Sequence, residues 1–290
     1  MATDNPYQSF VSGFAKLLLE GGGLKTDQLL LPKRPLIAPD APKVMIFAPH
    51  PDDEIIIGGL PLRILRELNL NVINVSVTLG SRRDRRTQRW QELKSCCDYI
   101  GFGLIAARDN GLENINSTTR EHQPQQWAVA VEIIVEILMT HRPSIIFVPH
   151  ADDWNITHIG THYLVLDAMK RCPDFTCLVA ETEWWGAMND PNLMVESSAT
   201  DVADLVAALS LHAGEVARNP FHLRLPAWMI DNVRRGAELI GGQGGPAPDF
   251  TFATLYRLRR WQRGQLHVSL ETGFFLSIKD KLTFLTGSVN

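Results

Sequence analysis

Four ionisable side chains crowd into the segment Pro49-His50-Pro51-Asp52-Asp53-Glu54. Its three acids would repel one another if buried, and each would raise its neighbours' pKa. A divalent cation relieves that conflict, because His nitrogen and Asp oxygen are both ligands of zinc. His50 and Asp53 lie three positions apart, so one turn can bring both to a single ion, with Asp52 beside it. Helix capping also favours acids at such a place, but it accounts for only one or two of them and not for a His between two prolines.

A second segment rich in ligand types covers residues 150–162, HADDWNITHIGTH. Its last two histidines, His158 and His162, lie four positions apart at an expected helix start and so face the same side. Either one can supply a third ligand. A single His on such a helix is more often a surface or core residue, but two clusters of His and Asp at neighbouring strand ends favour a metal site.

The elements that position these segments alternate between strand and helix. Strands are predicted over 44–48, 72–78, 144–148 and 176–182, and helices over 55–68, 85–100, 127–140 and 158–171. Strands separated by helices of this length predict a mostly parallel sheet with helices on both faces. Ligands of such folds bind beyond the carboxyl ends of the strands. The strands ending at Ala48 and Val148 run into the two ligand-rich segments, which therefore meet at one edge of the sheet.

The two ends of the chain carry less information. Residues 1–40 are predicted to be an extension with a short helix over 7–19, a glycine stop at 21–23 and a proline-rich connector. One domain is expected over 41–290, with a divergent part from about 237. In its last third we predict a helix over 201–217, a loop over 241–248 and strands over 250–258 and 266–277. Two roles are open for the extension and the basic C-terminal part: shaping the substrate mouth, or forming the interface of a homo-oligomer.

Composition excludes several classes of protein. The chain has 290 residues, of which 45% are hydrophobic, and a net charge of −4. This net charge indicates neither a basic surface for binding nucleic acid nor a polybasic membrane anchor. No apolar run approaches the ~18–20 residues of a spanning helix, and the N-terminus lacks a secretory signal pattern. We therefore predict a cytoplasmic protein whose four cysteines are reduced thiols, since no Cys-x-x-Cys pair occurs.

Three protein ligands with an open fourth position are typical of catalytic zinc. Such an ion lowers the pKa of bound water towards ~7 and polarises a carbonyl. Asp52 is placed to take the proton from that water as general base. Amide hydrolysis then passes through an oxyanion, which the metal and a nearby donor stabilise.

The stretch Ala48-Pro49-His50-Pro51-Asp52-Asp53-Glu54, followed by Gly58-Gly59, resembles the signature of the LmbE-like, or PIG-L, family of N-acetylglucosaminyl deacetylases. Shorter matches follow in the family's order. They are Thr78-Leu79-Gly80, Arg89-Trp90-Gln91-Glu92-Leu93, Asp109-Asn110-Gly111-Leu112, and residues 209–216 with His212. The resemblance covers roughly residues 43–236, and only its first motif is specific.

The resemblance implies a Rossmann-like three-layer α/β sandwich, a bound Zn²⁺ or another divalent metal such as Fe²⁺, and a small-molecule amino-sugar substrate. By the same resemblance His50, Asp53 and His158 are the metal ligands and Asp52 is the general base, with His162 as the fallback ligand. The sequence departs from the family pattern at Asn155, where His is usual, and at Thr157, where Asp is usual. Asn155 can donate a hydrogen bond but cannot deliver a proton, which leaves the general acid open. Asp153 can replace the carboxylate lost at Thr157.

Substrate contacts are predicted for a further set of polar residues. The resemblance assigns Arg89 and Asp109 to sugar hydroxyls, and Asn155, Asp153 and His212 complete the expected contacts. Arginines at 82, 83, 85, 86 and 89 suit a phosphate or carboxylate on the substrate, or else form a charged helix start on the surface. Glu183-Trp184-Trp185 is either a sugar-stacking wall or part of the core.

Two further hypotheses compete with a deacetylase. The arginine cluster fits a metal-dependent phosphoesterase, although two-metal sites need more acidic ligands than this chain offers. Asn155 and Thr157 fit a non-catalytic sugar-binding module on the same fold. Release of acetate from N-acetylated sugars separates both from the first hypothesis.

Overall fold

The computed structural model describes residues 5–24 and 29–286. One nine-stranded sheet forms its centre, in the order β3-β2-β1-β4-β5-β7-β6-β9, and β8 pairs with β7 outside this order. The strands are β1 (Lys43–Ala48), β2 (Asn71–Ser76), β3 (Gly103–Ala106), β4 (Ile145–Pro149), β5 (Cys177–Thr182), β6 (Leu193–Ser197), β7 (Phe252–Gln262), β8 (Gln265–Val268) and β9 (Phe274–Leu276). The α-helices are α1 (Gln8–Gly21), α2 (Asp53–Ile56), α3 (Gly59–Leu68), α4 (Arg86–Ile100), α5 (Ser117–His122), α6 (Pro124–His141), α7 (Ile156–Lys170), α8 (Ala199–Ser210), α9 (Ala213–Arg218) and α10 (Leu225–Gly241).

The sheet is mixed but mostly parallel. Strands β3, β2, β1, β4 and β5 pair in parallel, as expected when a helix connects each strand to the next. Beyond β5 the direction changes, because β7 pairs antiparallel with both β5 and β6. The predicted α/β fold with an N-terminal helix is therefore confirmed.

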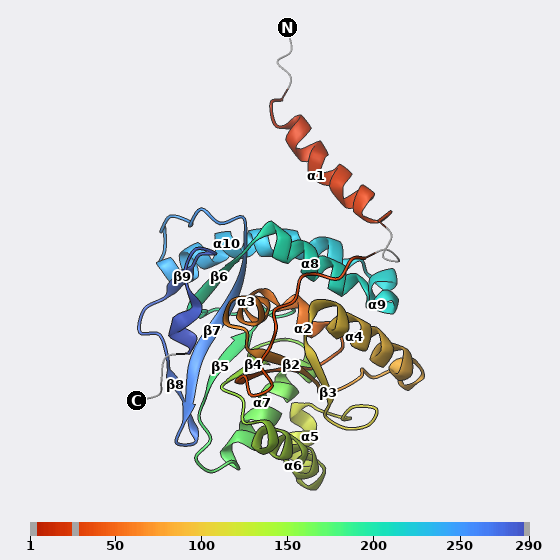
Figure 1. Ribbon diagram of the computed structural model, residues 1–290, viewed down its shortest axis with the longest axis vertical. Coiled ribbons are helices and arrows are strands. Elements are labelled where there is room, and N and C mark those ends of the chain that lie inside the picture. Colours follow the sequence, from red (N-terminus) through yellow and green to blue (C-terminus); the bar gives the residue numbers. More distant parts are fainter. Residues whose placement is uncertain (1–4, 25–28, 287–290) are drawn as a thin grey trace.

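Helices cover both faces of the sheet and make it a three-layer sandwich (Figure 1). Strand β1 illustrates why, since its side chains alternate between two hydrophobic cores. Val44, Ile46 and Ala48 pack with α2, α3, α4 and α8, whereas Met45 and Phe47 pack with α6 and α7. A strand buried on both faces has no polar alternation, and VMIFA is accordingly apolar throughout.

Several predicted elements differ in their bounds. The helix predicted over 55–68 is two helices, because the chain turns at Gly58, where an added Cβ would lie 2.6 Å from Leu205 of α8. The helix predicted over 201–217 divides into α8 and α9 at His212, which turns into the interior. The strand predicted over 266–277 is two short strands, and β3, β6, α5 and α10 were not predicted.

The N-terminal helix α1 lies apart from the three layers (Figure 1). None of its residues is buried, and its apolar side chains are exposed, including Phe10 (63%) and Leu17 (67%). Residues 29–42, which follow it, form neither helix nor strand, in agreement with the proline-rich connector. Within the described ranges, no helix has the length and apolar character needed to cross a membrane.

Candidate metal centre and active site

The first ligand-rich segment forms the turn between β1 and α2. Asp53 begins α2, and its Oδ2 accepts a hydrogen bond from the backbone N–H of His50 at 2.9 Å. Asp52 precedes the helix with φ 118°, which a residue with a side chain rarely adopts. Such backbone strain costs about 1–3 kcal/mol and persists only where surrounding contacts hold it.

His50, Asp53 and His158 come together at the carboxyl edge of the sheet. One ligand atom from each lies within 4.8 Å of the other two. Asp53 Oδ2 is 3.3 Å from His50 Nδ1 and 3.2 Å from His158 Nε2. His158 arrives on the first turn of α7, which follows β4, the neighbour of β1 in the sheet. The two strand ends therefore deliver the three side chains to one point, as the parallel topology requires.

The chemistry of this group fits a divalent cation. His158 Nε2 is buried and, despite its closeness to Asp53, has no hydrogen-bond partner. Its other nitrogen, Nδ1, lies 3.3 Å from Asp153 Oδ2, the arrangement in which a carboxylate orients a ligand histidine. Burial opposes a charged imidazole here, yet Asp53 and Asp153 together raise the pKa of His158 to about 10. A site that draws a proton so strongly onto a ligand nitrogen is one that favours a cation.

Asp52 lies next to this group but faces different partners. Its carboxylate is 3.7 Å from Arg89 Nη2, and Arg89 also donates to the Pro51 carbonyl at 2.9 Å. Burial raises the pKa of Asp52 well above its usual value, and the Asp53 carboxylate adds to this, while Arg89 opposes it. About 12% of the Asp52 side chain is exposed. Asp52 is thus near the ligands without joining them.

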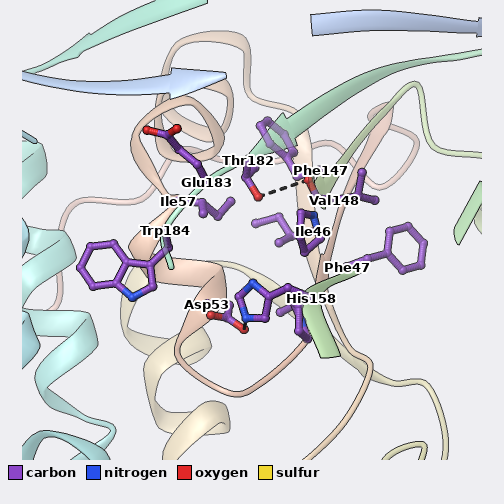
Figure 2. Close-up of a pocket in the computed structure, with 13 residues that line it drawn as sticks. Ile46, Phe47, Asp53, Ile57, Phe147, Val148, His158, Thr182, Glu183 and Trp184 are labelled. Atoms are coloured by element: carbon purple, nitrogen blue, oxygen red, sulfur yellow. Dashed lines mark hydrogen bonds and ion pairs between the residues drawn. The ribbon is translucent and has the colours of Figure 1, made fainter. Parts of the chain in front are cut away.

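Two hollows adjoin the ligand group. An inner cavity of about 20 Å³ is lined by Asp53 and His158 and by Ile57, Thr182 and Trp184, among others (Figure 2). An outer hollow of about 420 Å³ is lined by His50 together with Asn155 and Thr157. The first volume holds one water-sized group, whereas the second lies in the range of small-molecule sites. The three ligand side chains therefore stand between a small cavity and a large one.

A second group of ligand types, Glu54, Cys96 and His212, lies within the core behind the turn. All three are fully buried. The Glu54 carboxylate accepts from the Asp52 backbone N–H at 2.9 Å, from His212 Nε2 at 2.9 Å and from Cys96 Sγ at 3.4 Å. His212 was expected to contact substrate, but the structure places it behind the site, where it supports Glu54. No spacing in the sequence marks this pairing, since the two residues are 158 positions apart.

The other predicted residues occupy several environments. Asn155 lines the outer hollow and caps α7, its Oδ1 accepting from the Thr157 and His158 backbone N–H groups. Asp153 lies behind His158 and lines neither hollow. Asp109 is exposed and lines an adjacent hollow that shares Arg83 and Arg86 with the outer one.

His162, the fallback ligand, lies outside the ligand group. Its Nδ1 is 2.9 Å from the Pro149 carbonyl oxygen and 3.7 Å from Glu181. His150, in the same ligand-rich segment, is fully buried and places Nε2 2.8 Å from the Gly186 carbonyl oxygen. Of the histidines in this segment, the geometry favours His158 alone as the partner of His50 and Asp53.

Each arginine of the cluster has an acidic neighbour in the folded chain. Arg82 pairs with Asp84, while Arg83 and Arg86 share Glu113. Arg85 pairs with Glu215, and Arg89 lies between Asp52 and Glu215. Sequence inspection could not foresee Glu113 and Glu215 as partners, because both come from other parts of the chain.

A close backbone approach fixes the start of α7. A Cβ added to Gly160 would lie 2.3 Å from the Ile115 carbonyl oxygen. The segment 112–116, which contains Ile115, lines the outer hollow. Only glycine allows this contact, two positions after His158.

A family model described as GlcNAc-PI de-N-acetylase, PIG-L, matches residues 45–169. The resemblance to the PIG-L family is confirmed. The matched segment begins in β1 and ends in α7, so it contains His50, Asp53 and His158. No curated protein sequence gives a significant match to the chain.

Solved structures with the same fold extend the likeness beyond the matched segment. The N,N'-diacetylchitobiose deacetylase from Pyrococcus horikoshii is 16% identical, with a TM-score of 0.55 over 89% of this chain and 94% of that one. A deacetylase in the biosynthesis pathway of teicoplanin is 14% identical, with a TM-score of 0.54 over 76% and 99%. The 4-carboxy-2-hydroxymuconate hydratase GalB from Pseudomonas putida is 12% identical, with a TM-score of 0.53 over 75% and 95%. At these identities the likeness establishes the fold, which serves both deacetylases and a hydratase.

Proposed function

We propose that this protein is a metal-dependent amide hydrolase that removes a small N-acyl group, such as acetyl, from an amino-sugar derivative. The observation that carries the proposal is the group His50, Asp53 and His158, held within 4.8 Å between a cavity of about 20 Å³ and a hollow of about 420 Å³. The small cavity suits an acyl group and the large one suits a sugar. Zinc is the expected ion, because two imidazoles and one carboxylate are typical ligands of catalytic zinc.

A divalent cation in this group would lower the pKa of a water molecule towards ~7 and polarise an amide carbonyl. The side chains of the protein have separate tasks. His50, Asp53 and His158 hold the ion, and Asp153 orients His158 through Nδ1. Asp52, kept near by Arg89, is the proton acceptor.

Hydrolysis needs one proton to be moved twice. The water oxygen forms a bond to the acyl carbon as its proton passes to Asp52, and the carbonyl electron pair moves onto oxygen. When that pair returns, the C–N bond breaks and the nitrogen takes the proton from Asp52. The remaining hydroxyl proton goes to the amine as well, so that a carboxylate and an ammonium group are the products. Asn155 cannot deliver a proton, which is why Asp52 is assigned both transfers.

Acetylated amino sugars are proposed as substrates for two reasons. The outer hollow offers polar groups such as Asn155, Asn116 and Ser81 for hydroxyls. The family model describes a GlcNAc-PI de-N-acetylase, and one structure with the same fold is an N,N'-diacetylchitobiose deacetylase. The arginine cluster gives the phosphoesterase alternative less support than the sequence suggested, because each of its arginines has an acidic neighbour and Arg83 and Arg86 share one carboxylate.

Release of acetate from N-acetylglucosamine derivatives by the zinc-loaded full-length protein tests the proposal. We expect Asp52→Asn to keep its metal while turnover falls by ~10²-fold or more, the usual scale for a general base. Asp84→Asn is the matched control, because it removes an exposed carboxylate paired with Arg82. Full turnover by the Asp52 variant refutes the base assignment. Tight sugar binding without acetate release by the wild type supports the sugar-binding module instead.

A further inference from the structure

Two residues that line the inner cavity each carry a buried polar atom without a hydrogen-bond partner. Its polar side chains include Thr182, which donates to the Val148 carbonyl at 3.2 Å, and Glu183, which pairs with Arg235. The two atoms left over are His158 Nε2, on the metal side, and the indole nitrogen Nε1 of Trp184. A buried N–H without an acceptor costs about 1–3 kcal/mol, so each such group calls for an explanation.

Trp184 lies on the chain that follows β5, across the cavity from the ligand group. Figure 2 shows its indole ring beside the cavity, with the nitrogen on the edge of the ring nearer to Asp53 and His158. Trp184 thus lines the space that adjoins Asp53 and His158, and its buried Nε1 has no acceptor within the described protein.

Other aromatic side chains hold the indole in place. Trp228 packs edge-on against Trp184 with ring centroids 5.0 Å apart. Trp185 and Phe221 lie at 5.8 Å and 6.5 Å. A donor fixed by packing needs no reorganisation when charge develops on a substrate, which is the property that makes such donors effective. Packing against three other aromatic rings restrains the indole of Trp184 in its position beside the cavity.

We propose that Trp184 is a catalytic residue whose indole N–H donates a hydrogen bond to the acyl oxygen of the substrate in the inner cavity. The inference rests on the proposed function and specifies its acyl subsite. The carbonyl oxygen becomes negative when water adds to the acyl carbon, and it becomes a carboxylate oxygen in the product. A neutral N–H stabilises both forms and exchanges no proton. It would be a hydrogen-bond donor to the acyl oxygen in addition to Asn155.

The small cavity also limits the acyl chain. A volume of about 20 Å³ accepts one group the size of a water molecule or a methyl group. Formyl and acetyl amides are therefore the expected substrates, and longer acyl chains should react more slowly.

Replacement of Trp184 by Phe tests the hydrogen bond. The variant keeps an aromatic ring but loses the N–H, and removal of one such donor costs about 10²–10³-fold in turnover. We expect kcat of Trp184→Phe to fall by about 10²-fold, while KM and zinc content stay within about threefold of the wild type. Trp228→Phe is the matched control, since it removes an indole from the same aromatic cluster but not from the cavity. Equal losses in both variants, or a loss in KM alone, overturn the proposal.

A second measurement does not depend on turnover. In protein labelled with ¹⁵N-tryptophan and loaded with zinc, the Trp184 indole resonance is identified by its absence from Trp184→Phe. Titration with acetate should shift this resonance downfield and leave the Trp228 resonance in place. No shift at saturating acetate refutes the contact even if the enzyme is active. A shift in a protein that hydrolyses no amide upholds the small-carboxylate site and refutes the proposed function.

Discussion

Two groups of ligand-type side chains lie on opposite sides of one turn, and they differ in access. His50, Asp53 and His158 adjoin two hollows. Glu54, Cys96 and His212 are sealed in the core, where three donors already satisfy the carboxylate. Asp53 and Glu54 are neighbours in the sequence, yet one faces the site and the other supports it. Residue type alone therefore does not separate the two groups, whereas contact with a hollow does.

Loss of a ligand in the open group should have the largest effect. We expect Asp53→Ala or His158→Ala to weaken zinc binding by roughly 100-fold or more, because each ligand carries a large share of the ~10–16 kcal/mol typical of protein zinc sites. Metal analysis after dialysis measures this. Cys96→Ala is the matched variant in the sealed group and should retain one ion per chain. Loss of zinc from the Cys96 variant would place the ion in the sealed group and reverse the comparison.

Removal of His212 should be nearly as damaging, but to folding rather than to metal binding. His212→Leu leaves the Glu54 carboxylate buried without its main side-chain donor, which typically costs about 3 kcal/mol in the free energy of unfolding. His212→Gln keeps an N–H donor and should recover part of that loss. Urea denaturation of the two variants gives the difference. Equal stability of both variants would show that the hydrogen bond to Glu54 contributes little.

Asp153 permits a finer test of the open group. Its carboxylate lies behind His158 Nδ1, and such supporting partners are worth about 10–100-fold in metal affinity. We expect Asp153→Ala to weaken zinc binding by about tenfold, less than loss of a ligand. Competition with a chelator of known affinity resolves this step. An unchanged affinity would assign Asp153 to the packing of the turn alone.

The smallest expected effect concerns the cysteine of the sealed group, whose thiol should resist alkylation. Burial, reinforced by Glu54, raises the pKa of the Cys96 thiol well above its usual value, and Cys97 behaves alike. At pH 8 the folded protein should therefore react with iodoacetamide only after denaturant is added. Because the folded pKa is raised, the stabilising contribution is complete below the unfolded pKa of ~8.5 and declines as pH rises above it. Urea midpoints at pH 7 and pH 9.5 measure that decline, and a midpoint that rises with pH would contradict it.

The sequence was most informative where one strand determines the surroundings of a segment. The apolar runs of β1 and β4, each followed by a ligand-rich segment, were enough to predict that the two segments meet. They left His158 and His162 as alternatives, and the family resemblance favoured His158. Contacts from distant parts of the chain could not be predicted in the same way. Glu181 is fully buried on β5 and pairs with Arg257 and Arg259 of β7. The local sequence of neither strand predicts these ion pairs, because they depend on the antiparallel register between β5 and β7.

The contact at Gly160 links two parts of the candidate site mechanically. The backbone at Ile115 touches α7 with no side chain between them, and the same stretch of chain borders the outer hollow. A movement of this wall towards or away from a bound sugar would therefore carry the first turn of α7, and with it His158, in the same direction. The shape of the outer hollow and the position of His158 are in this way coupled by a direct contact between two backbone segments.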